Sequence, residues 1–123
     1  MLDTSLLSSV ARQMMSADEV EVEGQRLPVR RTSSRRLRMV AFTMGGREYA
    51  AIEQNPDKPS QWGQLARSGH EVVQFKDVDS NRFVAVVADG DVKEYGAGEG
   101  GGRLPPTGAE TWIGTRLVAK LRR

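Results

Sequence analysis

The chain lacks cysteine entirely and contains a single histidine, His70. The absence of cysteine excludes disulfides, thiolate metal sites and thiol nucleophiles, and we expect a reducing, cytoplasmic location. No apolar run approaches the roughly 18 residues that a membrane-spanning helix requires. The first residues carry an acid before any base, which does not fit a secretory leader. Any association with a membrane is therefore expected to be peripheral, through a partner protein.

Motifs for catalysis or for metal binding are also missing. His70 follows Gly69 at the end of a predicted helix, where a capping or solvent-facing role is typical, and no nucleophile motif accompanies it. Asp77, Asp79 and Asn81 alternate as in a calcium loop, but the glycine and the terminal glutamate of that motif are absent. We interpret these three as turn residues. The sequence predicts a protein that is not an enzyme, with no catalytic residue, no cofactor and no metal site.

The hydrophobic pattern predicts an α+β fold. Residues 1–17 are expected to form an amphipathic helix, because Leu6, Leu7, Val10 and Met14 recur at helical spacing. Residues 18–95 are expected to form a β-rich domain, whose small antiparallel sheet of about five to six strands is either curled or closed into a small barrel.

Turn and cap signals divide this domain into strands and one helix. The pairs Gly45-Gly46 and Asp89-Gly90 favour tight hairpins. Ser60 can cap a short helix through residue 67 that lies between two hairpins. The expected strands cover residues 20–26, 37–44, 47–54, 71–76, 82–88 and 91–95.

The composition changes abruptly after residue 95. Residues 96–110 are rich in glycine and proline and are expected to form an extended linker. The linker lacks the Gly-Lys-Ser/Thr ending of a phosphate-binding loop. Residues 111–123 form a basic amphipathic segment, predicted to dock on a partner through its apolar side chains. The expected anchors in this C-terminal tail are Trp112, Ile113, Leu117 and Leu121.

Arginine dominates the 18 basic residues, although the net charge is only +2. Five arginines fall within nine positions, and we expect them to meet an acidic protein or lipid surface, since guanidinium groups pair well with carboxylates and phosphates. These residues are Arg30, Arg31, Arg35, Arg36 and Arg38. A GC-rich genome would produce the same excess of arginine without any function.

One stretch resembles a small family of bacterial proteins that has no assigned activity. The resemblance covers residues 46–56 (GREYAAIEQNP), 59–62 (PSQW) and 69–77 (GHEVVQFKD), which span residues 46–77 when the loops between them are included. In size and type the chain is also similar to the peripheral cytoplasmic subunits of homodimeric type I photosynthetic reaction centres. That resemblance implies a subunit without pigment or iron–sulfur ligands.

Two functions remain open from the sequence. The first is a non-catalytic accessory subunit that docks onto a larger protein complex through its termini, because tryptophan and arginine are enriched at the centres of interfaces. The alternative is a small basic nucleic-acid-binding domain that uses residues 30–38 to contact phosphates. The acidic run at residues 18–23 lies beside these arginines, and no aromatic stacking motif for bases is present. We therefore favour the accessory subunit.

Overall fold

The computed structural model describes residues 3–95 of the chain, which form two helices and two antiparallel sheets. The α+β class expected from the sequence is confirmed. The predicted linker at 96–110 and the docking segment at 111–123 lie outside the described residues. The elements are α1 (Thr4–Ser16), β1 (Glu19–Val22), β2 (Gln25–Pro28), β3 (Arg30–Arg31), β4 (Arg38–Met44), β5 (Arg47–Glu53), α2 (Gln61–Arg67), β6 (Val72–Asp77), β7 (Arg82–Ala88) and β8 (Asp91–Tyr95).

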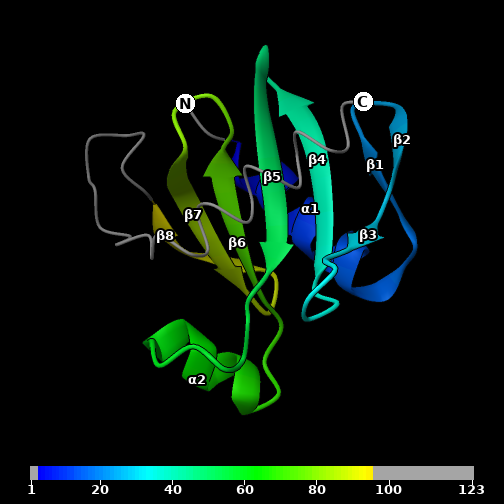
Figure 1. The fold of residues 1–123 in the computed structure, drawn as a ribbon. Helices are drawn as coiled ribbons and strands as arrows, with labels where there is room; N and C mark the ends of the chain where they lie inside the picture. The colour runs from blue at the N-terminus through cyan, green and yellow to red at the C-terminus, as the bar shows by residue number, and fades with distance from the viewer. Residues whose placement is uncertain (1–2, 96–123) are drawn as a thin grey trace.

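The larger sheet is an open antiparallel meander. Its six strands follow the chain in the order β3-β4-β5-β6-β7-β8, so β3 and β8 form its two edges. The sheet is therefore not closed into a barrel, and of the two forms predicted, the open sheet is the one observed. In Figure 1, α1 lies behind this sheet and α2 lies below it. The two helices therefore lie at different sides of the sheet.

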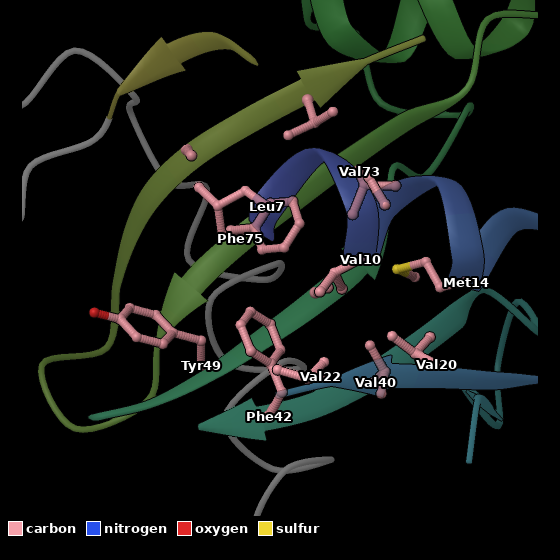
Figure 2. Close-up of a cluster of buried hydrophobic side chains, with 14 of the residues drawn as sticks. Leu7, Val10, Met14, Val20, Val22, Val40, Phe42, Tyr49, Val73 and Phe75 are labelled. Atoms are coloured by element: carbon pink, nitrogen blue, oxygen red, sulfur yellow. The ribbon is translucent and has the colours of Figure 1, made fainter. Parts of the chain in front are cut away.

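Helix α1 covers one face of the sheet. The helix begins where the Asp3 side chain accepts a hydrogen bond from the backbone N–H of Leu6 at 3.1 Å, which caps its first turn. Leu7, Val10 and Met14 recur at intervals of three and four residues and are fully buried. Figure 2 shows these side chains pointing into one apolar cluster with the sheet.

Aromatic side chains form the sheet side of this cluster (Figure 2). Phe42 and Tyr49 are cross-strand partners whose rings stack with centroids 5.8 Å apart. Phe75 meets Phe42 edge to face at 6.0 Å. Such arrangements suit the charge distribution of aromatic rings. The aromatic residues Phe42, Tyr49 and Phe75 of β4, β5 and β6 are thus used for packing.

The segment after α1 differs from the prediction. A single strand was expected over residues 20–26, but the chain forms two short strands, β1 and β2, which pair around Glu23 and Gly24. Both turn residues adopt positive φ angles of 49° and 84°, the geometry of a tight hairpin turn. The Gln13 side chain holds this hairpin against α1, accepting from the N–H of Glu21 at 2.9 Å and donating to its carbonyl at 3.2 Å. The prediction missed the turn because Glu-Gly is a weaker hairpin signal than Gly-Gly.

Helix α2 follows the predicted range closely. The Ser60 hydroxyl accepts from the N–H of Gly63 at 3.1 Å and caps the helix. A Cβ atom at Gly63 would lie 2.1 Å from the carbonyl oxygen of Lys58. Only glycine allows the helix to approach the preceding loop this closely. Within residues 3–95, no helix is long and apolar enough to cross a membrane.

Candidate functional site

A pocket of about 320 Å³ lies where the loop between β3 and β4 meets the end of β5. Its volume falls at the lower end of the range for small-ligand sites, about 300–1,000 Å³. The pocket is large enough for one or two side chains of a partner. Its lining residues come from four segments and are Thr32, Ser34, Arg35, Leu37, Ile52, Glu53, Gln54, Asn55, Lys58, Gln74 and Phe83.

One wall of the pocket is the arginine-rich loop at residues 32–37. Thr32 is buried and closes the loop, because its N–H donates to the carbonyl of Leu37 and its hydroxyl accepts from the N–H of Leu37, both at 2.9 Å. Arg36 adopts a positive φ of 55° at the tip, and its carbonyl accepts from Nη1 of Arg31 at 3.0 Å. These bonds fix the loop over the pocket.

The loop between β5 and α2 supplies a second part of the lining, with Asn55 and Lys58. Asn55 shapes this loop, as its Oδ1 accepts from the N–H of Asp57 at 2.9 Å. Arg67 of α2 donates to the carbonyls of Pro56 and Lys58 at 2.5 and 2.9 Å. Asp57 in turn forms an ion pair of 2.5 Å with Arg35, which lines the pocket. Both partners are more than half exposed, so this ion pair is expected to contribute little to stability.

The strands and the residues next to them contribute apolar side chains and two amides to the lining of the pocket. Leu37, Ile52 and Phe83 supply the apolar surface. Gln74 donates from Nε2 to the side-chain carbonyl of Gln54, and Gln54 donates to the carbonyl of Asn55 at 3.0 Å. A few fixed amides on an apolar surface are typical of sites that orient a bound group. Sequence analysis missed these residues; for Gln74, the alternation of apolar and polar residues in 73–76 was the available signal.

The five predicted arginines do not act as one patch. Arg30 and Arg31 lie exposed on the edge strand β3, and Arg36 is exposed at the tip of the loop. Arg35 lines the pocket. Arg38 turns toward α1, where its Nη1 donates to the carbonyls of Met14 and Ala17 at 3.0 and 3.5 Å.

Arg38 therefore satisfies carbonyls at the C-terminal end of α1 and places a cation at the negative end of its dipole. The other predicted anchors, Trp112, Ile113, Leu117 and Leu121, lie outside the described residues. Of the predicted binding residues, the structure brings Arg35 to the pocket, with Arg30, Arg31 and Arg36 on the adjoining surface.

His70 is paired with an acid near α2. Its Nδ1 lies 2.6 Å from Oδ2 of Asp89, and Oδ1 of Asp89 accepts from the N–H of Glu71 at 2.9 Å. The hydrogen bond from His70 is the main cause that lowers the pKa of Asp89 below its ordinary value. Asp89 thus ties the turn before β8 to the chain that leaves α2.

Asp77 organises the turn between β6 and β7. Its Oδ1 accepts from the N–H groups of Asp79 and Ser80 at 2.9 and 3.1 Å. Its Oδ2 accepts from Nε and Nη2 of Arg47 at 2.8 and 2.6 Å. Burial by itself raises the pKa of Asp77, but the bonds from Ser80 and Arg47 outweigh burial and lower it.

Lys76 is the most unusual polar residue of the sheet, because it is 0% exposed in a central strand. Burial disfavours its charged form and lowers its pKa from 10.5 to about 8. It faces away from α1, beside Ala50 and Phe83 in the neighbouring strands. Within residues 3–95, no group of three or more potential ligands could hold a metal ion.

Comparisons with protein-family models, with curated proteins and with solved structures found no match to this chain. The resemblance of residues 46–77 to a bacterial family, and the similarity to reaction-centre subunits, therefore stay predictions. The function has to be argued from the geometry of the pocket and of its surroundings.

Proposed function

We propose that this protein is a non-catalytic accessory subunit of a larger protein complex. In the pocket beside residues 32–37 it binds a segment of its partner in which acidic residues flank an apolar side chain. One observation carries this proposal: part of the arginine-rich segment singled out from the sequence, including Arg35, lines a pocket together with the apolar side chains of Ile52 and Phe83. An apolar side chain of the partner would contact Leu37, Ile52 and Phe83. The amides of Gln54 and Gln74 would orient the partner's backbone.

The charges around the pocket select the kind of partner. Arg35 and Lys58 line the pocket together with one acid, Glu53, and Arg35 is paired with Asp57. Three further arginines are exposed on the adjoining edge strand and loop, so cations outnumber acids in this region. Guanidinium groups bind carboxylates in a bidentate manner. A partner segment with acids flanking an apolar anchor would satisfy both kinds of surface. The C-terminal tail, with Trp112 and Leu117, is the second contact expected with the partner complex.

A charge-reversal experiment tests the pocket. The variant Arg30→Glu, Arg31→Glu, Arg36→Glu should lose co-purification with the partner, because like charges replace the attraction at the pocket mouth. The matched control is Arg12→Glu, Arg26→Glu, Arg82→Glu, which changes the net charge equally at exposed arginines elsewhere. The control should co-purify at the wild-type yield. Equal loss in both variants would indicate a non-specific charge effect and contradict the proposal.

Nucleic-acid binding is the competing outcome of the same experiment. If residues 30–38 contact phosphates, an arbitrary RNA or DNA should bind at low salt and dissociate steeply as salt rises. The triple variant at Arg30, Arg31 and Arg36 would then reduce that affinity and its salt dependence. Fluorescence anisotropy with a labelled oligonucleotide measures both quantities. Strong, salt-sensitive binding lost in the triple variant but kept in the control would replace the docking proposal.

A further inference from the structure

The loop between β3 and β4 carries two exposed serines. Ser33 and Ser34 lie in its turn, and among residues 3–95 neither hydroxyl has a hydrogen-bonding partner. The preceding Thr32 differs, because it is buried and its hydroxyl accepts from the N–H of Leu37 at 2.9 Å. The hydroxyl of either serine is therefore available to another molecule, whereas that of Thr32 holds the loop together.

Arginines flank these serines on both sides. Arg30 and Arg31 precede Ser33 by three and two positions, and Arg35 and Arg36 follow it by two and three. All four arginines are exposed, and within the described part of the chain only Arg35 among them forms an ion pair. Kinases select their substrates by such charge patterns, and an arginine-directed serine kinase holds the arginines before the acceptor with its own carboxylates. The segment presents this pattern on the surface of the fold.

We propose that Ser33 is a phosphate-acceptor site for an arginine-directed serine kinase. Its Oγ attacks the γ-phosphorus of a nucleoside triphosphate held by the kinase, so that an Oγ–P bond forms while the bond to the bridging oxygen of the β-phosphate breaks. The nucleoside diphosphate leaves with the electron pair of that bond, and the hydroxyl proton passes to a base of the kinase. Ser33 has arginines both two and three positions before it, whereas Ser34 has only Arg31, at three.

The edge position of β3 lets a kinase reach this segment. Kinases bind an acceptor segment in extended form, and Arg30 and Arg31 are already extended in β3. This strand lies at the edge of the large sheet and pairs with β4 over two residue pairs. Segments with few bonds open locally at a lower free energy than the whole fold. The loop can therefore enter a kinase while β4 to β8 stay paired.

Phosphorylation also changes the charge beside the pocket, and this second step rests on the proposed function. A phosphoserine carries about −1.5 to −2 charges at pH 7, so it offsets about half of the charge of the four arginines. Ser34, the next residue, lines the pocket, which places the new charge beside the binding site. The phosphate competes with the acids of the partner for the guanidinium groups. Phosphorylated Ser33 should therefore release the partner.

Phosphate transfer to the full-length, folded chain tests the acceptor site. The protein is incubated with a purified arginine-directed serine kinase and ATP, and fragment masses identify the modified residue. We expect a phosphoryl group on Ser33. Ser33→Ala should abolish the modification, whereas Ser34→Ala and Ser68→Ala should keep it. Ser68 is the matched control, because it is exposed and follows a single arginine, Arg67.

Arginine variants test what the kinase recognises. Arg30→Ala with Arg31→Ala should lower the kcat/KM of the kinase for the chain by at least about tenfold, because charge-assisted hydrogen bonds to the kinase are lost. Arg35→Ala with Arg36→Ala removes the same charge after the acceptor and should lower it by less than about threefold. Equal losses in the two double variants would show that only the overall charge matters, and would overturn the proposed recognition.

A synthetic peptide of residues 27–39 is the positive control for the kinase. Modification of the peptide but not of the folded chain would show that the fold withholds Ser33, and would overturn the proposal. Modification of Ser34 in place of Ser33, or of neither residue in chain and peptide, would overturn it as well. Circular dichroism of each variant checks that the sheet still forms.

Co-purification separates this inference from the proposed function. Kinase treatment should lower the yield of partner with the wild-type chain by at least about tenfold and leave the yield with Ser33→Ala unchanged. A partner that stays on the phosphorylated chain, but is lost from the variant Arg30→Glu, Arg31→Glu, Arg36→Glu, would overturn the release step and leave the proposed function standing. If no partner co-purifies with the untreated chain, the proposed function fails, and the kinase assay alone decides whether Ser33 is an acceptor.

Discussion

The two faces of the six-stranded sheet are built differently. The face toward α1 holds a continuous cluster of apolar and aromatic side chains, closed by α1 and the β1–β2 hairpin. The opposite face places Gln74 and Lys76 among its apolar residues, next to a pocket, and side chains of α2 pack against its β6–β7 part. Burial of polar groups lowers stability unless they are well paired. We therefore expect the first face to contribute more to the stability of the fold, whereas the second lies beside the pocket of the proposed function.

The largest expected effect comes from the α1 face. Phe75→Ala should lower the free energy of unfolding by about 3–5 kcal/mol, because it opens a cavity where Phe75 meets Phe42. Leu65→Ala on α2 should cost less than about 2 kcal/mol, since Leu65 is only partly buried. Chemical denaturation of both variants measures the difference. Equal costs would show that the two faces contribute equally to stability.

The second prediction uses the pH dependence of Lys76. Below pH 8, Lys76 is charged in both the folded and the unfolded chain, so its contribution to stability does not change with pH. Between pH 8 and 10.5 the unfolded chain binds more protons than the folded one, and stability rises with pH. A pKa unit corresponds to about 1.4 kcal/mol, so the total rise should approach about 3 kcal/mol.

Lys76→Met should abolish this rise in stability between pH 8 and 10.5. Lys93→Met is the matched control, because Lys93 is exposed in β8 and its loss should leave the pH profile unchanged. Denaturant midpoints of the three proteins across this pH range measure the effect. A wild-type profile that is flat, or that falls, between pH 8 and 10.5 would show that Lys76 is hydrated and that this part of the face is open to water.

Much of the fold could be predicted because its signals are local. Helical spacing in residues 3–15, the Gly45-Gly46 pair and the Ser60 cap each act over a few residues. The β1–β2 hairpin escaped prediction, since its turn depends on Glu23 adopting a positive φ of 49°. Most non-glycine residues avoid this conformation, so the sequence gives little warning of it.

The candidate site was only partly predictable, because the pocket is assembled from distant segments. The arginine-rich segment was found from composition, but its members separate in three dimensions. Gln54 and Gln74 are twenty positions apart, and only the pairing of β5 with β6 brings them together. Arg38 looked like its neighbours in sequence, yet the register of β4 turns it toward α1.

The smallest expected effects come from two arginines, of which one is hydrogen-bonded to α1 and the other lines the pocket. Arg38→Ala should lower the free energy of unfolding by about 1 kcal/mol, because the carbonyls of Met14 and Ala17 lose a charged donor at the end of α1. Arg35→Ala should change it by less than about 0.5 kcal/mol, since its ion pair with Asp57 is exposed to solvent. Thermal unfolding at low and high salt measures both variants. If Arg35→Ala proved the more destabilising, the loop beside the pocket would contribute more to stability than the contact of Arg38 with α1. The proposed difference between the two faces of the sheet would then be wrong.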